Sequence, residues 1–282
     1  MVNIRELDPS ASPLDYFGSE LRRKREAAGL TQKQLGAVIF CTGSLIGQIE
    51  TTLKVPTREF AERADAALMT DGFFSRLVGL VLRSQLPGWF QPYAEMEAKA
   101  TYISTFQAQV VYGLLQTERY ARAVLGASKG GRLDELVAAR LERQRLLRRE
   151  RPPSVWVVLD EAVLYRPMGG LEVMREQLAH LLSFHDQRLV NIQVLPYSAG
   201  EHPSVHGAFN ILRFNDHPDI VYTEDFIQGH MTANPEGVSE GWLHYDQLRA
   251  AALSVRDSAE LITHVMEERY ADRPAAERRD VA

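Results

Sequence analysis

The stretch from residue 31 to residue 50 constrains the fold most, because it has the pattern of two short helices joined by a tight turn. Thr31, followed three residues later by Gln34, predicts a capping box: the hydroxyl accepts an orphan backbone N–H, and the amide side chain reaches back to the cap. Thr42 can cap the second helix, and apolar residues recur at helical spacing on both helices. A third helix, predicted over residues 16–28, precedes the pair. Proteins use this arrangement to hold a helix in the major groove of DNA.

Residues 16–60 resemble the helix-turn-helix domain of Xre-type, phage-repressor-like regulators. The matching sequence motifs are Leu-Arg-Arg-Lys-Arg-Glu-Ala-Ala-Gly-Leu-Thr-Gln (21–32) and Ile-x-x-Ile-Glu (46–50). The resemblance implies an all-α domain that binds double-stranded DNA. It also implies that Arg25 and Glu50 form an internal ion pair between the first helix and the recognition helix.

The same resemblance assigns DNA contacts to this domain. It implies that the Gln32 side chain bonds a phosphate, that the start of the second motif helix faces base edges, and that Arg58 reaches the backbone or the minor groove. Gln48 is the strongest base reader, because a side-chain amide pairs a donor with an acceptor as the major groove requires. The predicted DNA-binding residues are Gln32, Lys33, Thr42, Gly43, Ser44, Leu45, Gln48, Lys54 and Arg58.

The sequence departs from the resemblance at two glycine positions and on the recognition helix. Phe40 replaces the glycine usual in the turn, and Thr52 replaces the one usual after the recognition helix. Apart from Gln48, the recognition helix offers mainly small or apolar residues to the bases. This composition favours modest DNA binding, or binding that requires a dimer or a partner.

Charge is distributed unevenly along the chain. Residues 16–60 carry seven Lys or Arg against four Asp or Glu, a net charge of +3, whereas the whole chain carries −5. A basic surface confined to one small domain is typical of a regulator and not of a protein that coats DNA.

The bulk composition indicates a globular protein of the cytoplasm. The chain has 282 residues, of which 45% are hydrophobic, which is enough for two domains. Its single cysteine, Cys41, excludes an intramolecular disulfide and fits the cytoplasm. No window approaches the length and apolarity of a membrane span, so no membrane partner is expected.

Prolines, glycines and helical periodicity predict the boundaries between domains. We expect a helix-turn-helix domain over residues 1–72, a connecting helix or linker over 73–88, a C-terminal sensing or dimerisation domain over 89–272, and a flexible tail over 273–282.

The second domain is predicted to belong to the α+β class, as a small antiparallel sheet covered by helices. The expected helices are 92–107, 114–125, 132–150, 171–185 and 239–270. The expected strands are 155–160, 190–195, 207–214 and 219–224.

This region also resembles a known domain. The matching sequence motifs include Gly113-Leu-Leu-Gln-Thr-Glu-Arg-Tyr, Val173-Met-Arg-Glu-Gln-Leu and Gln193-Val-Leu-Pro. They resemble the uncharacterised C-terminal domain of Xre-type regulators of actinomycetes. The resemblance implies a developmental or antibiotic-related regulator, commonly encoded beside a small acidic partner protein. It provides no catalytic residue and no cofactor.

Several side chains could form a ligand-binding or metal site, and each also has a purely structural interpretation. Trp89, Trp156 and Tyr222 could line a pocket for a small effector molecule, although large aromatic residues more often belong to the core. His202 and His206 lie four apart, but in a loop that contains a proline, so no metal site is predicted.

Two further features have competing interpretations. An enzyme would need a convergent polar pocket near Glu161, His202, His206 or Glu224, and no nucleophile elbow or phosphate loop accompanies them. The arginine-rich segment 140–151 is interpreted as a mainly solvated helix face, with a docking surface for nucleic acid or an acidic partner as the alternative.

Together these features predict a cytoplasmic, homodimeric, sequence-specific DNA-binding transcriptional regulator without enzymatic activity. Its C-terminal domain would dimerise, or sense an effector or a small partner protein. The alternative is a protein-interaction module that neutralises a small partner protein and reads DNA weakly or not at all.

Overall fold

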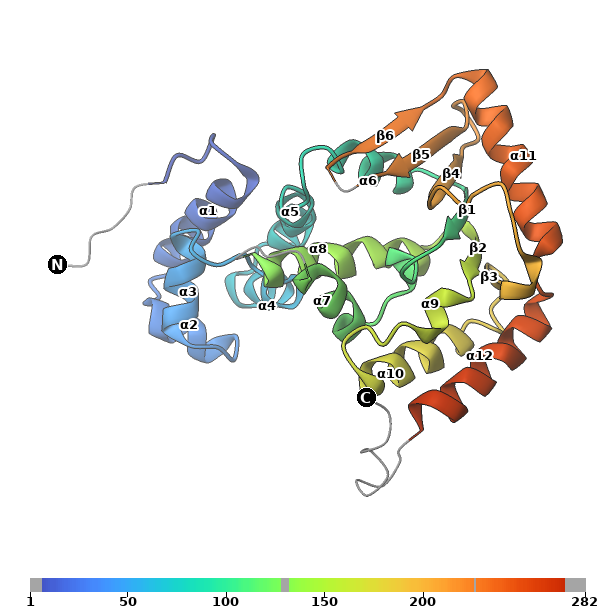
Figure 1. Cartoon of the computed structure of the whole chain (residues 1–282). Helices are drawn as coiled ribbons and strands as arrows, with labels where there is room; N and C mark the ends of the chain where they lie inside the picture. Colours follow the sequence, from blue (N-terminus) through green and yellow to red (C-terminus); the bar gives the residue numbers. More distant parts are fainter. Residues whose placement is uncertain (1–6, 128–131, 226, 272–282) are drawn as a thin grey trace. The chain divides into compact units, whose positions relative to one another are not determined.

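The computed structural model of the chain describes residues 7–127, 132–225 and 227–271 (Figure 1). The chain divides into two compact units, which we call unit 1 (residues 1–91) and unit 2 (residues 92–282). The predicted tail, 273–282, lies outside the described residues.

Unit 1 is all-α over its described residues. Its helices are α1 (Pro13–Ala27), α2 (Gln32–Val38), α3 (Gly43–Glu50), α4 (Arg58–Leu68) and α5 (Phe73–Arg83). The predicted capping box is confirmed: Thr31 Oγ1 accepts the Gln34 N–H, and Gln34 Oε1 accepts the Thr31 N–H. Thr42 caps α3 by accepting the Leu45 N–H at 3.2 Å.

The core of unit 1 forms where apolar faces of its helices meet. Phe17 and Leu21 of α1, Leu35 of α2, and Ile46 and Ile49 of α3 are buried. Elsewhere in the unit, one buried carboxylate joins two helices: Asp65 of α4 accepts the backbone N–H groups of Phe74 and Ser75 at the start of α5. Asp65 thereby satisfies donors that a helix N-terminus leaves without partners.

Two residues of unit 1 adopt the left-handed backbone conformation at the positions where the resemblance places glycine. Phe40, in the turn between α2 and α3, has φ 59°, and Thr52, after α3, has φ 60°. This conformation costs a residue with a Cβ about 1–2 kcal/mol. Both turns therefore keep the geometry that glycine favours, at the expense of stability.

Unit 2 is built on a mixed sheet flanked by helices. Its described strands are β1 (Tyr102–Gln107), β2 (Ser154–Asp160), β3 (Val190–Leu195), β4 (Phe209–Arg213), β5 (Ile220–Glu224) and β6 (Gly229–Thr232). Its described α-helices are α6 (Gln91–Glu97), α7 (Glu118–Gly126), α8 (Leu133–Gln144), α9 (Ala162–Tyr165), α10 (Leu171–Leu182), α11 (Pro235–Ala251) and α12 (Val255–Tyr270). Short 3-10 turns lie at Gly113–Leu115, Arg145–Arg148 and Tyr197–Ala199.

The prediction of a small antiparallel sheet was wrong. The described strands form one six-stranded sheet in the order β3-β2-β1-β4-β5-β6. β1 and β3 both pair with β2 in parallel, whereas β4, β5 and β6 continue the sheet as an antiparallel series. β1 is thus the point at which the sheet changes from parallel to antiparallel.

The error has a local cause, because residues 92–107 were predicted to be one helix. The helix ends at Glu97, and residues 102–107 form the central strand β1. Ile103 to Phe106 are all buried, since both faces of the strand are covered. Two consecutive helices, α11 and α12, replace the single helix predicted over 239–270, and Ser254 caps the second of them.

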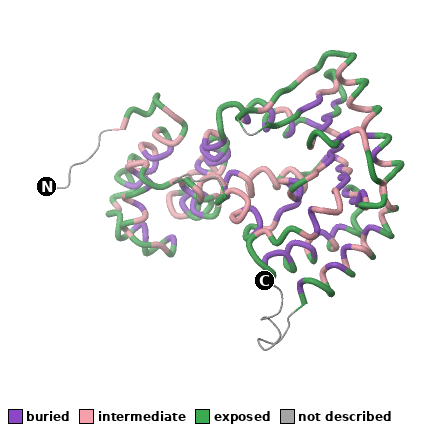
Figure 2. The backbone as a smooth tube through the Cα atoms, in the orientation of Figure 1, coloured by how far each residue is buried: buried purple, intermediate pink, exposed green. Residues whose placement is uncertain are grey.

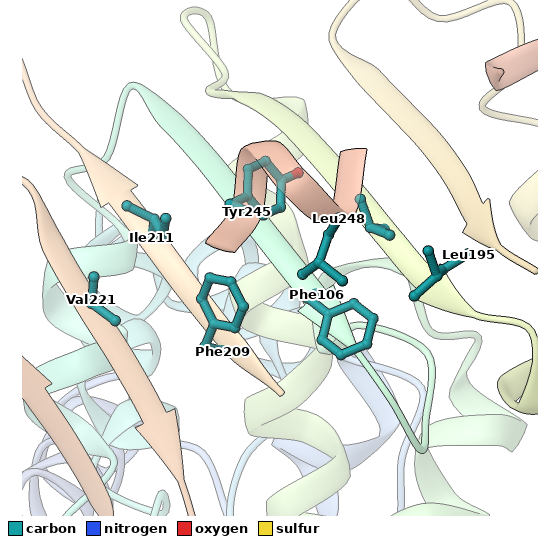
Figure 3. Packing of buried hydrophobic residues seen from close by; sticks show 8 residues of the cluster. Phe106, Leu195, Phe209, Ile211, Val221, Tyr245 and Leu248 are labelled. Atoms are coloured by element: carbon teal, nitrogen blue, oxygen red, sulfur yellow. The ribbon is translucent and has the colours of Figure 1, made fainter. Parts of the chain in front are cut away.

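One face of the sheet packs against α11. Phe106, Phe209, Ile211 and Val221 from three neighbouring strands form a buried cluster with Tyr245 of α11 (Figure 3). The buried residues of unit 2 concentrate along its strands (Figure 2).

Candidate nucleic-acid interface

Helix α3 has a buried side and an exposed side. Ile46 and Ile49 are buried, whereas Ser44 and Gln48 are exposed and Leu45 is half-buried. Thr42 is exposed just before the helix, and Gly43 is half-buried at its first position. The exposed side therefore presents a hydroxyl and an amide, which can both donate to and accept from base edges.

A buried ion pair fixes α3 to α1, as the resemblance implied. Arg25 Nε donates to Glu50 Oε1 at 2.5 Å, and Arg25 Nη2 donates to Glu50 Oε2 at 3.1 Å. Glu50 is 3% exposed and Arg25 is 7% exposed. The Glu50 carboxylate raises the pKa of Arg25 although burial opposes this shift. The two parallel hydrogen bonds set the orientation of α3.

Gln32, predicted to bond a phosphate, also contacts the recognition helix. Its Nε2 donates to Glu50 Oε2 at 2.8 Å, although the residue is exposed. A Cβ at Gly47 would lie 3.0 Å from Gln32 Oε1. The Gln32 amide therefore lies against α3 and adds to the Arg25–Glu50 pair. This contact was not predicted from the sequence.

Glycines permit the close approach of α2 and α3. A Cβ at Gly43 would lie 2.9 Å from Lys33 Cα, and a Cβ at Gly36 would lie 2.7 Å from the Cys41 carbonyl oxygen. Cys41 itself is half-buried. Because the close atoms belong to the backbone, side chains at these two positions would push the motif helices apart.

The three basic residues predicted to contact phosphates differ in their surroundings. Lys33 and Lys54 are exposed, close to the two ends of the motif. Arg58 is half-buried, and its Nη1 donates to the Ser75 carbonyl at 2.8 Å. Arg58 therefore also holds α4 to α5.

The structure also shows exposed apolar side chains near the motif. Phe40 is 85% exposed, Leu53 74% and Val38 54%. In the sequence, the only sign of these exposed apolar side chains was the presence of Phe40 where the resemblance places a glycine.

The aromatic residues proposed to line an effector pocket do not come together in unit 2. Trp156 packs against the cluster beneath α11, with the Arg249 guanidinium 3.8 Å from its ring centre. Tyr222 follows Val221 of that cluster, so it points to the opposite face of the sheet, where it stacks on Tyr93 at 4.0 Å. The third residue, Trp89, belongs to unit 1.

The arginine-rich segment is mainly exposed, as predicted, at Arg145, Arg148, Arg149 and Arg151, whereas the Arg143 side chain is buried. Arg143 of α8 donates through Nε and Nη2 to Glu97, at 2.9 and 2.8 Å. Glu97, 1% exposed, also accepts from the hydroxyls of Tyr112 and Tyr93, at 2.7 and 3.1 Å. Burial, together with the Glu97 charge, raises the pKa of both tyrosines well above the ordinary value. They remain neutral donors.

Residues considered for metal binding or catalysis are dispersed. Within the described ranges, no group of three His, Cys, Asp or Glu side chains could hold a metal ion. The His202 ring packs edge-on against Phe106, and Glu161 accepts the Tyr197 N–H at 2.7 Å. Only His206 and Glu224 line a common groove. No described helix is both long and apolar enough to cross a membrane.

The capped helix pair and the buried ion pair behind its exposed face define a helix-turn-helix protein. Comparison with known families agrees, because the family described as helix-turn-helix domain matches residues 17–72. The chain belongs to the family described as domain of unknown function (DUF5753), which matches residues 90–264. These matches confirm the predicted combination of a helix-turn-helix domain with an uncharacterised C-terminal domain. Neither a curated protein nor a solved structure matches the chain.

Proposed function

We propose that this protein is a sequence-specific DNA-binding regulator of transcription that inserts α3 into the major groove. The observation that carries the proposal is the exposed side of α3, whose orientation is set by the Arg25–Glu50 pair. The match to a helix-turn-helix domain supports DNA binding.

In this proposal the exposed residues divide into two roles. Ser44, Leu45 and Gln48 contact base edges, with Leu45 placed to touch a thymine methyl group. Lys33 and Lys54 contact phosphates and supply affinity that does not depend on sequence. The remaining proposed contacts come from Gln32, Thr42, Gly43 and Arg58.

We further propose that the protein acts as a homodimer in the cytoplasm. Two copies would address half-sites about 34 Å apart, one turn of the duplex. Unit 2 would hold the copies together, or would bind an effector molecule or a small acidic partner protein that shifts the affinity for DNA. We propose no catalytic role for any residue.

The test is selection from a pool of random-sequence duplexes with the full-length chain, followed by titration of the selected duplex and a scrambled duplex at several salt concentrations. We expect enrichment of a sequence with two related halves and a steep loss of affinity as salt rises, because each neutralised phosphate releases counterions. Equal affinity for selected and scrambled duplexes would overturn the proposal of sequence-specific binding.

A second candidate function is that of a protein-interaction module that neutralises a small partner protein. The exposed apolar side chains of Phe40, Leu53 and Val38 near the motif motivate it, because a protein partner could cover them. Absence of duplex binding at low salt, together with tight capture of a small protein that co-purifies, would favour this candidate over DNA reading.

A further inference from the structure

A groove of about 540 Å³ opens in unit 2 beside the face of the sheet that α11 covers. Its floor is formed by Phe209 of β4 and by Val221 and Thr223 of β5. One wall is the loop 203–208, and the other is the first half of α11. Figure 3 shows Phe209 and Val221 on adjacent strands, with Tyr245 of α11 nearby. The volume lies within the range of about 300–1,000 Å³ found for small-molecule sites.

Glycines leave this space open. Gly207 in the loop, and Gly237 and Gly241 on α11, all line the groove. At Gly241 the helix lies directly on the sheet, since a Cβ there would lie 2.7 Å from Val221 Cγ2. At Gly207 a Cβ would meet nothing within 4 Å.

The groove lies at the end of the sheet where β1 finishes and β4 begins. Phe106, near the end of β1, is opposite Phe209 at the start of β4. Phe209 is in turn opposite Thr223 near the end of β5, and Thr223 is opposite His230 of β6. The groove thus begins beside the carboxyl end of β1, where the sheet changes from parallel to antiparallel.

The lining is acidic above an apolar floor. Asp225 and Glu240 line the groove together with the imidazoles of His206, His230 and His244, and its described lining contains neither lysine nor arginine. Glu224 also borders the groove, but its carboxylate accepts the Tyr222 hydroxyl on the other face of the sheet. Backbone N–H groups of Gln228 and Ile227 lower the pKa of Asp225, so this carboxylate stays charged. The Glu240 side chain is 71% exposed, and His244 Nε2 lies 4.0 Å from its carboxylate.

We propose that this groove binds an organic cation: a primary amine or guanidinium group attached to an aromatic or branched aliphatic body. The body would lie on Phe209 and Val221, and the cation would face the carboxylates of the rim. Charge complementarity selects this class, because an anion of the same shape would meet the carboxylates of Asp225 and Glu240 without a compensating lysine or arginine among the described lining residues.

The experiment titrates the full-length chain with three probes of one shape: 1-naphthylmethylamine, 1-naphthylmethanol and 1-naphthoate. Affinity is measured by calorimetry at low salt, and binding is located by chemical-shift changes of the histidine ring protons. We expect the amine to bind best and the carboxylate worst, with changes confined to His206, His230 and His244. Equal affinity of amine and alcohol, or no binding by any probe, would overturn the proposal.

Variants locate the site and the charge. Glu240→Gln should lower the affinity for the amine roughly three- to fivefold and leave the affinity for the alcohol unchanged, as expected for a solvent-exposed charge pair. Asp246→Asn makes the same chemical change at an exposed position of α11 outside the groove and should alter neither affinity. Thr223→Trp should block all three probes by filling the floor.

A thermal transition near that of the parent chain, measured for each variant, shows that the variant is folded. Retained amine binding in folded Thr223→Trp would place the ligand elsewhere and overturn the proposal. The readout is binding to unit 2, so failure of the DNA-binding proposal would leave this result standing.

Discussion

Both units contain a buried arginine–glutamate pair, and the two pairs differ in their surroundings. In unit 1, Arg25–Glu50 joins two helices directly behind an exposed polar surface. In unit 2, Arg143–Glu97 is enclosed together with two tyrosine hydroxyls that donate to the same carboxylate. The first pair orients a surface, whereas the second completes an interior. A buried arginine–glutamate pair therefore supports a binding surface in unit 1, whereas the pair in unit 2 has a structural role.

The largest expected effect is in unit 2. Glu97→Ala leaves the Arg143 charge buried without its carboxylate, which should lower the free energy of unfolding of this unit by about 3–5 kcal/mol. Hydrogen exchange followed by mass spectrometry reads each unit separately and would detect faster exchange across β1 and α8. Glu176→Ala, which removes an exposed partner of Arg119, is the control and should change stability by less than about 1 kcal/mol. A similar small effect of Glu97→Ala would show that the pair is not structural.

Glu50→Ala should lower the stability of unit 1 by about 3 kcal/mol, for the same reason of an orphaned buried charge. It should also abolish duplex binding, because both Arg25 and Gln32 lose the carboxylate that holds them to α3. Exchange rates in α1 and α3, compared with those of Glu26→Ala, test the stability effect. Full DNA binding by Glu50→Ala would show that the Arg25–Glu50 pair does not orient the DNA-binding surface, and the proposed difference between the two pairs would be wrong.

At the surface itself, Gln48→Ala should reduce discrimination between selected and scrambled duplexes by about 1–3 kcal/mol, because a base contact is lost. Lys33→Ala should instead lower the affinity for both duplexes equally. It should also reduce the slope of log affinity against log salt by about the amount of one phosphate contact. Titrations of both duplexes measure these effects. Equal losses on the two duplexes for Gln48→Ala would refute its role as a base reader.

Asp65 provides a test of acid stability in unit 1. Burial raises its pKa, but hydrogen bonds from Ser75, Thr70 and the Phe74 N–H outweigh burial, and the pKa lies below the ordinary value of 3.8. The unfolded chain therefore binds the proton more readily, so the contribution of Asp65 is present above pH 3.8 and is lost as the pH falls below it.

Asp65→Asn should cost about 1–2 kcal/mol at neutral pH. It should also flatten the acid limb of a stability–pH curve measured by urea denaturation. An unchanged acid limb would show that other carboxylates control acid unfolding.

The smallest expected effect is stabilising. Thr52→Gly should raise the unfolding free energy of unit 1 by about 0.5–1 kcal/mol, because the left-handed conformation no longer strains a Cβ. Ala37→Gly, at an exposed helical position of α2, should lower it by a similar amount. Thermal unfolding of the two variants would compare them directly, and destabilisation by Thr52→Gly would show that the Thr52 side chain makes a stabilising contact.

Much of unit 1 could be predicted because its signals are local. Thr31, Gln34 and Thr42 cap helices whose hydrogen bonds span only a few residues. The resemblance supplied the Arg25–Glu50 pair, which no local pattern would reveal. The hydrogen bond from Gln32 to Glu50 was not predicted, since it depends on how closely the motif helices approach.

Unit 2 was predicted less well because its sheet depends on distant partners. Residues 98–100 (Ala-Lys-Ala) continue a helical composition up to β1, and the pairing of β1 with β2 and β4 is decided elsewhere in the chain. β6 begins with a glycine and spans four residues, too short for a periodic signal. Two lining residues of the groove, His206 and Glu224, were noted as candidates, but the groove itself requires assembly of β4, β5, β6 and α11.

The central position of β1 bears on how the chain emerges from the ribosome. β1 pairs with Val155 through Ile103 and with Phe209 through Phe106, so its two neighbours are translated long after it. During this interval the helices before residue 91 already contain both partners of the Arg25–Glu50 pair and of the Asp65 hydrogen bonds to α5, whereas β1 has an unpaired edge that invites association with other nascent chains. Chaperone demand during synthesis should therefore peak between translation of β1 and translation of β4.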